Sequence, residues 1–200
     1  MNNTEQRILQ LVHQNNGVIR TQDVMEAGLR RDYLSALVEK GYLLRVRRGL
    51  YQFYDTFVDD QVELQKRYPG SIFSYGNALY YHGLSDRVPH HMTITVLQGS
   101  NVSQLKKDYM DLEVHYVKNN EILNLGKTYG ETSFGQPIVI YDKERCICDL
   151  IKDRKKVDKQ LFTDALKGYF KCESADYIKL VRYAQALGVE NMVRLYMEVL

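Results

Sequence analysis

The pattern in this 200-residue chain that comes closest to an active site combines a Gly-Ser pair with two carboxylates. Gly99-Ser100 precedes Asp111 and Glu113 by about ten residues, which loosely matches the G-S and D-x-E motifs of nucleotidyltransferases. In such enzymes the carboxylates hold Mg²⁺ and the Gly-Ser loop takes phosphate. Asp142, after a later expected strand, offers a third carboxylate. Because so short a pattern arises easily by chance, we expect no enzyme and keep a nucleotidyltransferase-like enzyme using Asp111 and Glu113 as an alternative.

The histidines and cysteines do not form a recognised metal site. His90-His91 follows a proline, and adjacent side chains of this kind point apart. Cys146 and Cys148 form C-x-C with only Cys172 far along the chain, which is not a zinc spacing. An odd number of cysteines in a chain without an export signal also argues against disulfides. We therefore expect no metal, no cofactor, and thiols that are buried or half-buried.

Basic side chains are the remaining chemistry, and they concentrate near the N-terminus. The formal net charge is +2, and residues 1–55 carry eight Lys and Arg against six Asp and Glu. Arg45, Arg47 and Arg48 lie at or beside one turn, and Arg30 and Arg31 begin an expected helix. Because the excess of charge is small, a nucleic-acid partner is indicated by where these arginines lie rather than by their number.

The elements that would position these arginines follow from periodicity and turn residues. Apolar spacing predicts a helix over 4–15, a short helix over 21–27 that Thr21 caps, and a third over 30–40. Gly28 forms the short turn before the third helix. Two alternating segments over 42–54 flank Arg48-Gly49 and predict a β-hairpin. This order is that of a winged helix-turn-helix, with the hairpin as its wing.

A winged helix places its third helix in the major groove of double-stranded DNA and its wing on phosphates or in the minor groove. The predicted DNA contacts are Arg20, Thr21, Arg30, Arg31, Tyr33, Ser35, Arg45, Arg47, Arg48 and Tyr51. Tyr33 and Tyr51 either bond phosphates through their hydroxyls or are packed. The acidic Asp32 and Glu39 on the third helix keep a second alternative open, a winged-helix module that binds a protein.

The rest of the chain predicts an α+β domain that ends in helices. Strands are expected over 93–97, 112–117 and 137–141, and helices over 62–68, 77–82, 144–155, 158–170, 174–187 and 190–200. The boundary is expected where the hairpin gives way to a polar run, so we predict domains 1–57 and 58–200. A basic cluster lies near the end of the helix at 144–155 and in the turn after it, and either complements that helix's dipole or forms a second contact surface. Its members are Lys152, Arg154, Lys155, Lys156 and Lys159.

No stretch is apolar enough to span a bilayer, and the N-terminus lacks the features of a signal peptide. We therefore expect a cytoplasmic protein with no membrane contact.

Several blocks, taken in order, resemble the AbiEi antitoxins of type IV toxin–antitoxin (abortive infection) systems. Residues that resemble their N-terminal domain lie at 17–21, 27–29, 33–34, 37–43 and 45–51. The segments 74–89 and 93–96 resemble the region that follows the wing. Residues 141–151 resemble a Y-D-x-E-R-x-x-x-D block, and 183–184 lie in the closing helices. The resemblance covers nearly the whole chain.

The resemblance implies two activities and a defence role against phage. The winged helix represses the protein's own operon by binding inverted repeats near the promoter. The C-terminal domain neutralises a nucleotidyltransferase toxin encoded next to it, and the two proteins need not form a stable complex. We expect a monomer in solution that pairs on DNA. The basic cluster at 152–159 is the predicted surface for neutralisation.

Overall fold

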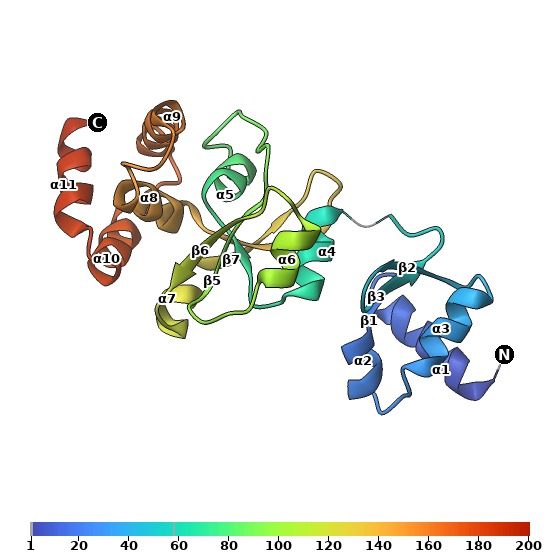
Figure 1. The fold of residues 1–200 in the computed structure, drawn as a ribbon. Coiled ribbons are helices and arrows are strands. Elements are labelled where there is room, and N and C mark those ends of the chain that lie inside the picture. The colour runs from blue at the N-terminus through green and yellow to red at the C-terminus, as the bar shows by residue number, and fades with distance from the viewer. Residues whose placement is uncertain (1, 58) are drawn as a thin grey trace. The chain divides into compact units, whose positions relative to one another are not determined.

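The computed structural model describes residues 2–57 and 59–200 and shows an α+β protein, as the sequence predicts (Figure 1). Its contacts divide the chain into two compact units, one that ends at Arg67 and one that runs from Tyr68 to Leu200.

The N-terminal unit contains helices and a small antiparallel sheet. The helices are α1 (Asn3–Gln14), α2 (Thr21–Glu26), α3 (Asp32–Glu39) and α4 (Asp60–Arg67). The strands are β1 (Val18–Arg20), β2 (Leu43–Arg47) and β3 (Leu50–Phe53), in the order β1-β3-β2. Apolar side chains from α1 to α3 meet the sheet in one core. It consists of Ile8, Val12, Ile19, Val24, Leu34, Leu37, Leu43 and Tyr51.

Local sequence explains most of these elements. Asn2 and Glu5 form a capping box at the start of α1, with Asn2 Oδ1 accepting from the Glu5 amide at 2.8 Å. The expected hairpin is confirmed, and Gly49 supplies the positive φ of 78° that its two-residue turn needs. The third helix, however, begins at Asp32 rather than at residue 30, so Arg30 and Arg31 precede it. Strand β1 was not expected from the sequence, because three residues are too few for their periodicity to reveal a strand.

Helix α4 is linked by side chains to the rest of the N-terminal unit. The guanidinium of Arg47 pairs with Glu63, and Lys66 Nζ donates to the Asn15 carbonyl at 2.9 Å. The sequence predicts the boundary between residues 57 and 58, and residue 58 lies outside the described residues. The contacts group α4 with the N-terminal unit. The sequence does not reveal this grouping, because ion pairs between distant residues leave no local signal.

The C-terminal unit is built on a mixed five-stranded sheet in the order β6-β5-β4-β8-β7. The strands are β4 (Ile72–Phe73), β5 (Thr93–Leu97), β6 (Glu113–Val117), β7 (Lys127–Glu131) and β8 (Pro137–Tyr141). Strands β5, β6 and β8 were expected from the sequence, whereas β4 and β7 were not. The β5–β6 and β4–β8 pairs are parallel, and the β4–β5 and β7–β8 pairs are antiparallel.

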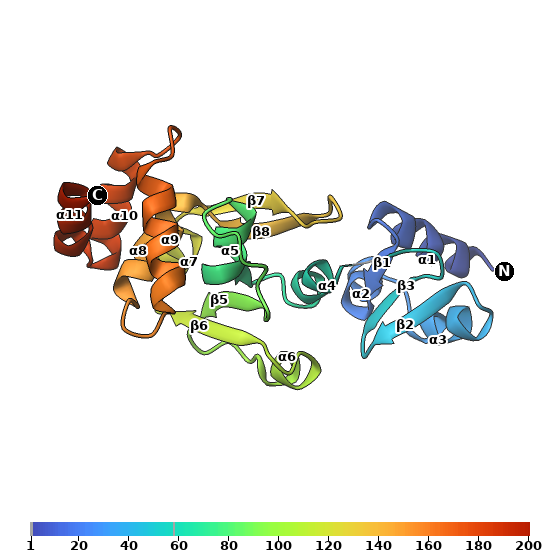
Figure 2. The same cartoon turned by 90° about the horizontal axis from the view of Figure 1, so that it is seen from above.

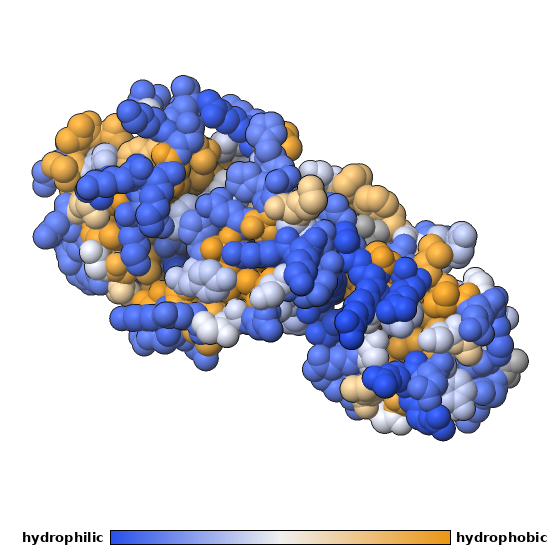
Figure 3. Space-filling view, viewed as in Figure 1, coloured by the Kyte–Doolittle hydropathy of each residue, from blue (hydrophilic) through white to orange (hydrophobic). Residues whose placement is uncertain are grey.

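Seven helices complete the described part of this unit. They are α5 (Tyr75–Tyr81), α6 (Ser103–Asp108), α7 (Asn120–Asn124), α8 (Lys143–Lys152), α9 (Lys159–Phe170), α10 (Tyr177–Leu187) and α11 (Glu190–Val199). The last four gather at one end of the sheet, around α8 (Figure 2). In the space-filling view, hydrophilic side chains cover much of the visible surface, with an apolar patch over α11 (Figure 3). Among the described residues, no helix has the length and apolar character needed to cross a membrane.

The Y-D-x-E-R-x-x-x-D block stabilises the fold. Arg145 is 1% exposed, and its Nε donates to Asp149 at 2.9 Å while its guanidinium lies 4.2 Å from the centre of the Tyr141 ring. Asp142 caps α8 by accepting from the Arg145 amide. Lys179 of α10 reaches the Asp142 carboxylate at 2.9 Å and that of Glu144 at 2.8 Å. These buried polar groups therefore satisfy one another and join α8 to α10.

The three cysteines lie in the C-terminal unit. Cys146 and Cys148 are buried on α8, Cys172 is half-buried, and all three are free thiols. The prediction of buried or half-buried thiols is thus confirmed.

Candidate nucleic-acid interface

Ion pairs within the protein occupy half of the six arginines predicted to contact DNA. Arg20 pairs with Asp23, Arg30 with Asp32, and Arg47 with Glu63.

Arg20 stabilises the start of α2. Its backbone N–H donates to the Asp23 carboxylate at 2.8 Å, and its Nε donates to the same group at 3.0 Å. The hydrogen bond to Asp23 raises the pKa of Arg20. Because this pair is half-buried and locally neutral, Arg20 positions α2 rather than offering a free charge. Thr21 follows it as the first residue of α2, half-buried, rather than as the N-cap that the sequence predicts.

Arg47 and Tyr51 turn inward. The Glu63 carboxylate that Arg47 meets is 5% exposed, so this ion pair joins the hairpin to α4. Tyr51 is 7% exposed and belongs to the core. This burial favours packing, one of the two roles that the sequence leaves open for Tyr51. Tyr33 packs half-buried against the same core.

Arg31, Arg45 and Arg48 are the exposed arginines of the predicted set that form no ion pair with another described residue. Arg31 is the N-cap residue of α3. Arg45 stands directly across the ladder from Tyr51, which itself stands across from Ile19. Residues directly opposite each other share a face of a sheet. Arg45 therefore projects on the helix-covered face, at the edge strand against which α3 packs.

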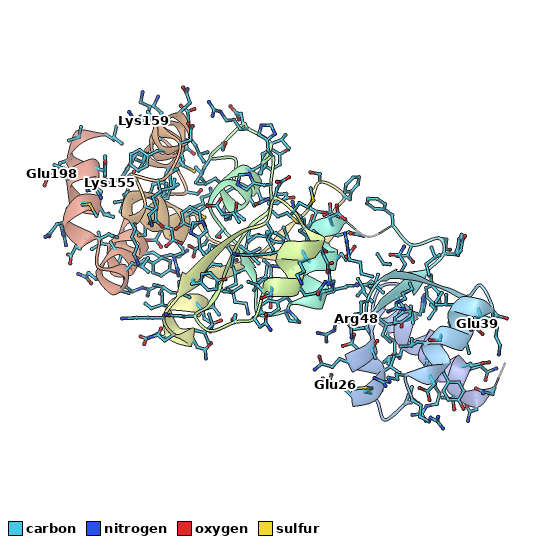
Figure 4. The ribbon with its side chains drawn as sticks, viewed as in Figure 1. Glu26, Glu39, Arg48, Lys155, Lys159 and Glu198 are labelled. Atoms are coloured by element: carbon cyan, nitrogen blue, oxygen red, sulfur yellow. The ribbon has the colours of Figure 1, made fainter. Side chains whose placement is uncertain are left out.

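Arg48 lies at the turn of the hairpin (Figure 4). The turn is joined to the start of α2, where the Thr21 amide donates to the Gly49 carbonyl at 2.9 Å. Glu39, at the other end of α3, lies well away from Arg48 in the same view. Lys40 directly follows Glu39 as the C-cap residue, so this end of α3 carries both charges.

The outer face of α3 is small and polar at its centre. Ser35 is exposed, and Arg30 and Asp32 at the start form an exposed ion pair of 2.6 Å, with 78% and 64% of their side chains accessible. An ion pair exposed to this degree contributes little stability, so phosphate competes easily for its guanidinium.

The predicted basic cluster is exposed in the C-terminal unit. Helix α8 ends at Lys152 instead of continuing to residue 155, and the cluster follows its end and the turn into α9. All five side chains are exposed, and Figure 4 labels Lys155 and Lys159 among them. Lys156 lies 3.5 Å from Asp153, and Arg154 donates weakly to the Ile151 carbonyl at 3.4 Å.

The nucleotidyltransferase pattern does not assemble. Strand β5 runs parallel to β6, with Thr93 opposite Glu113 and Leu97 opposite Val117. Gly99-Ser100 therefore follows the far end of β5, about 13 Å along the strand direction from the end where Glu113 lies. Asp142, the suggested third carboxylate, caps α8 and binds Lys179. Among the described residues, no three His, Cys, Asp or Glu side chains form a group suited to a metal ion.

Sequence reasoning missed one feature, a cleft of about 790 Å³ in the C-terminal unit. It brings together His90-His91, Glu113, Tyr75 and the α8–α9 turn, which are distant in sequence. The positive φ of Tyr75, 45°, is unusual for a non-glycine residue and marks the same place.

Comparison with known proteins finds a family of transcriptional regulators. Residues 6–54 match the family model described as "Transcriptional regulator, AbiEi antitoxin", which confirms the resemblance over this segment. The crystal structure of the RV2827C protein from Mycobacterium tuberculosis is similar in fold, with a TM-score of 0.58 and 13% sequence identity. The match covers 92% of this chain and 72% of that one. No curated protein matches the chain.

Proposed function

We propose that this chain, whose residues 6–54 belong to the AbiEi antitoxin transcriptional regulators, is the antitoxin of a type IV toxin–antitoxin system and represses its own operon. Its N-terminal unit acts as a winged helix-turn-helix that binds promoter DNA. The observation that carries this proposal is that Arg31, Arg45 and Arg48 are exposed and form no ion pair with another described residue. They lie in a run of successive helices and a hairpin, within a segment that matches a family of regulators.

The proposed DNA contacts divide into direct and positioning residues. Ser35 and Arg31 face bases or nearby phosphates from α3, while Arg45 and Arg48 hold the backbone or the minor groove. Arg30 joins them when phosphate displaces Asp32. Arg20 and Arg47 act indirectly, because their ion pairs hold the start of α2 and the hairpin in place.

The C-terminal unit neutralises a nucleotidyltransferase toxin encoded beside it, and the basic cluster is the proposed surface. Support comes from five exposed cations within eight residues of chain. Replacing all five with Gln abolishes rescue of growth from the toxin while promoter binding by the N-terminal unit persists. Full rescue by this variant would overturn the role of the cluster.

The decisive experiment measures fluorescence anisotropy of the full chain with DNA from upstream of its own operon and with a scrambled duplex. A preference of roughly 10³ or more for the native site is expected of an operator-binding protein. Two monomers per inverted repeat are expected from a chain that is monomeric in solution and acts in the cytoplasm.

A protein-binding module is the second candidate, favoured by the acidic Asp32 and Glu39 on α3. Weak and equal affinity for both duplexes would reject the repressor and favour this alternative.

A further inference from the structure

The cleft in the C-terminal unit lies where α5, the segment 85–91, the first residues of β5 and β6, and the α8–α9 turn meet. Its apolar lining comes from Val88, Pro89, Val157 and Leu161. Its volume of about 790 Å³ falls in the range of small-molecule sites, which are largely apolar with a few convergent polar groups. The cleft lies entirely within this unit and contains no residue from the proposed DNA interface.

One carboxylate organises the polar part of the cleft. Glu113 accepts from His91 Nε2 at 3.1 Å through one oxygen and lies 3.1 Å from His115 Nε2 through the other. Its side chain is 50% exposed, and that of His115 is 26% exposed. A carboxylate with several lone pairs has acceptor capacity left for N–H groups of a ligand.

An aromatic pair forms another part of the lining. The Tyr75 ring stacks on His115 with centroids 3.9 Å apart and an interplanar angle of 21°. The Tyr75 hydroxyl donates to Asp153, and burial raises its pKa, so that it remains a donor. The left-handed backbone of Tyr75 costs free energy, and such strain concentrates at binding sites. The structure therefore holds a stacking platform at the cleft by several contacts.

The α8–α9 turn contributes Lys156 to the cleft together with Asp153 and Asp158, and the segment 85–91 contributes Arg87. Lys156 lies 3.5 Å from Asp153, and Arg87 lies 3.2 Å from Asp158. Both cations are largely exposed, at 83% and 58% of the side chain, so an anionic ligand competes for them with little loss. The other four members of the basic cluster flank Lys156 along the chain and add to the local positive field.

We propose that this cleft binds a nucleoside phosphate, with the base stacked on His115 and its N–H edge on Glu113, and the phosphate on Arg87 and Lys156. Stacking platforms combined with cationic tracks are how proteins take nucleotides without sequence preference. The apolar walls suit the sugar and the face of the base. The ligand is either a free nucleotide or the terminal nucleotide of a strand whose further phosphates follow the basic cluster.

The test titrates the full chain by calorimetry with AMP, GMP, CMP and UMP, with adenosine, and with inorganic phosphate. At least one mononucleotide is expected to bind more tightly than either adenosine or phosphate alone. The double variant Arg87→Gln with Lys156→Gln is expected to weaken nucleotide binding at least about tenfold and to leave adenosine unchanged. The matched control is Lys107→Gln with Lys167→Gln, which removes two exposed charges outside the lining.

His115→Leu tests the stacking and is expected to weaken nucleotide and adenosine alike, by about tenfold. His115 also contacts Glu113, so the thermal unfolding of the His115→Leu variant is compared with that of the wild type. Should His115→Leu fail to fold, the surface variant Arg87→Gln with Lys156→Gln still tests the proposal.

A five-nucleotide RNA distinguishes the two sources. The ligand is a strand end if the RNA binds much more tightly than its terminal mononucleotide and if Lys152→Gln with Lys155→Gln weakens this binding. The ligand is a free nucleotide if the RNA and the mononucleotide bind with equal affinity. No binding of any of these probes at millimolar concentration, or binding that neither cleft variant changes, would overturn the proposal. Promoter affinity is expected to be unchanged in every cleft variant, so that failure here is separate from failure of the repressor.

Discussion

Replacing Arg31, Arg45 and Arg48 together with Gln is expected to flatten the salt dependence of promoter binding. These are the predicted arginines that are exposed and form no ion pair with another described residue, so each is available to displace a counterion from DNA. Each phosphate contact contributes about 0.9 to the slope of log affinity against log salt concentration. Three contacts contribute about 2.7, so between 50 and 200 mM salt the wild type should lose about 40-fold more affinity than the triple variant.

Fluorescence anisotropy with a labelled promoter duplex over this salt range provides the assay. Arg7→Gln is the matched control for a single loss, because Arg7 is exposed on α1 and outside the predicted set. It should leave the slope nearly unchanged where Arg48→Gln lowers it by about 0.9. Arg47→Gln should lower thermal stability and leave the salt slope nearly unchanged, because Arg47 pairs with the buried Glu63 carboxylate and does not offer a free charge to DNA. An unchanged slope in the triple variant, or an equal loss of slope in Arg47→Gln, would refute this assignment of free and paired arginines.

Three further predictions follow from the buried contacts. Arg145→Met should lower the free energy of unfolding in urea titrations by about 3–5 kcal/mol, because Asp149 stays buried without its partner. Adding Asp149→Leu should restore part of this loss. A double variant no more stable than Arg145→Met would contradict the prediction. Tyr51→Phe should keep full promoter affinity, because the ring stays packed in the core. Tyr51→Ala should lose about 3 kcal/mol of stability. Weak DNA binding by a stable Tyr51→Phe protein would instead show that the hydroxyl contacts DNA. Burial raises the pKa of Glu144, but Lys179 and backbone hydrogen bonds together lower it below the ordinary glutamate value. The stabilisation is therefore fully present well above the ordinary glutamate pKa and is lost as the pH falls through the lowered pKa. Urea titrations from pH 7 to 3 should show that Lys179→Met is less stable than the wild type at pH 7 and loses less stability as the pH falls, because Glu144 no longer has the pKa depression that Lys179 causes. Coincident curves would exclude the pair as the cause.

Much of the fold follows from local sequence. The stripe at Leu34 and Leu37 identified α3, and Arg48-Gly49 identified the hairpin, because amphipathic periodicity and turn chemistry act over a few residues. Strands β5 and β8 were placed with their observed ends. In the C-terminal unit, β4 was missed because it is two residues long, and β7 was missed because it lacks strongly apolar side chains. Pairing with β8 stabilises each of them.

The sequence by itself determined that arginines gather around a helix and a hairpin, and only the tertiary structure decided which of them are free. Arg47 and Arg48 are neighbours in the chain, yet one is paired with a buried carboxylate sixteen residues away and the other lies exposed at the turn. The same holds for the cleft, where Tyr75 meets His115 across forty residues. Periodicity indicates which face of an element is buried. Ion pairs, stacking and clefts depend on how separate elements pack, and that packing is determined by contacts between residues far apart in the chain.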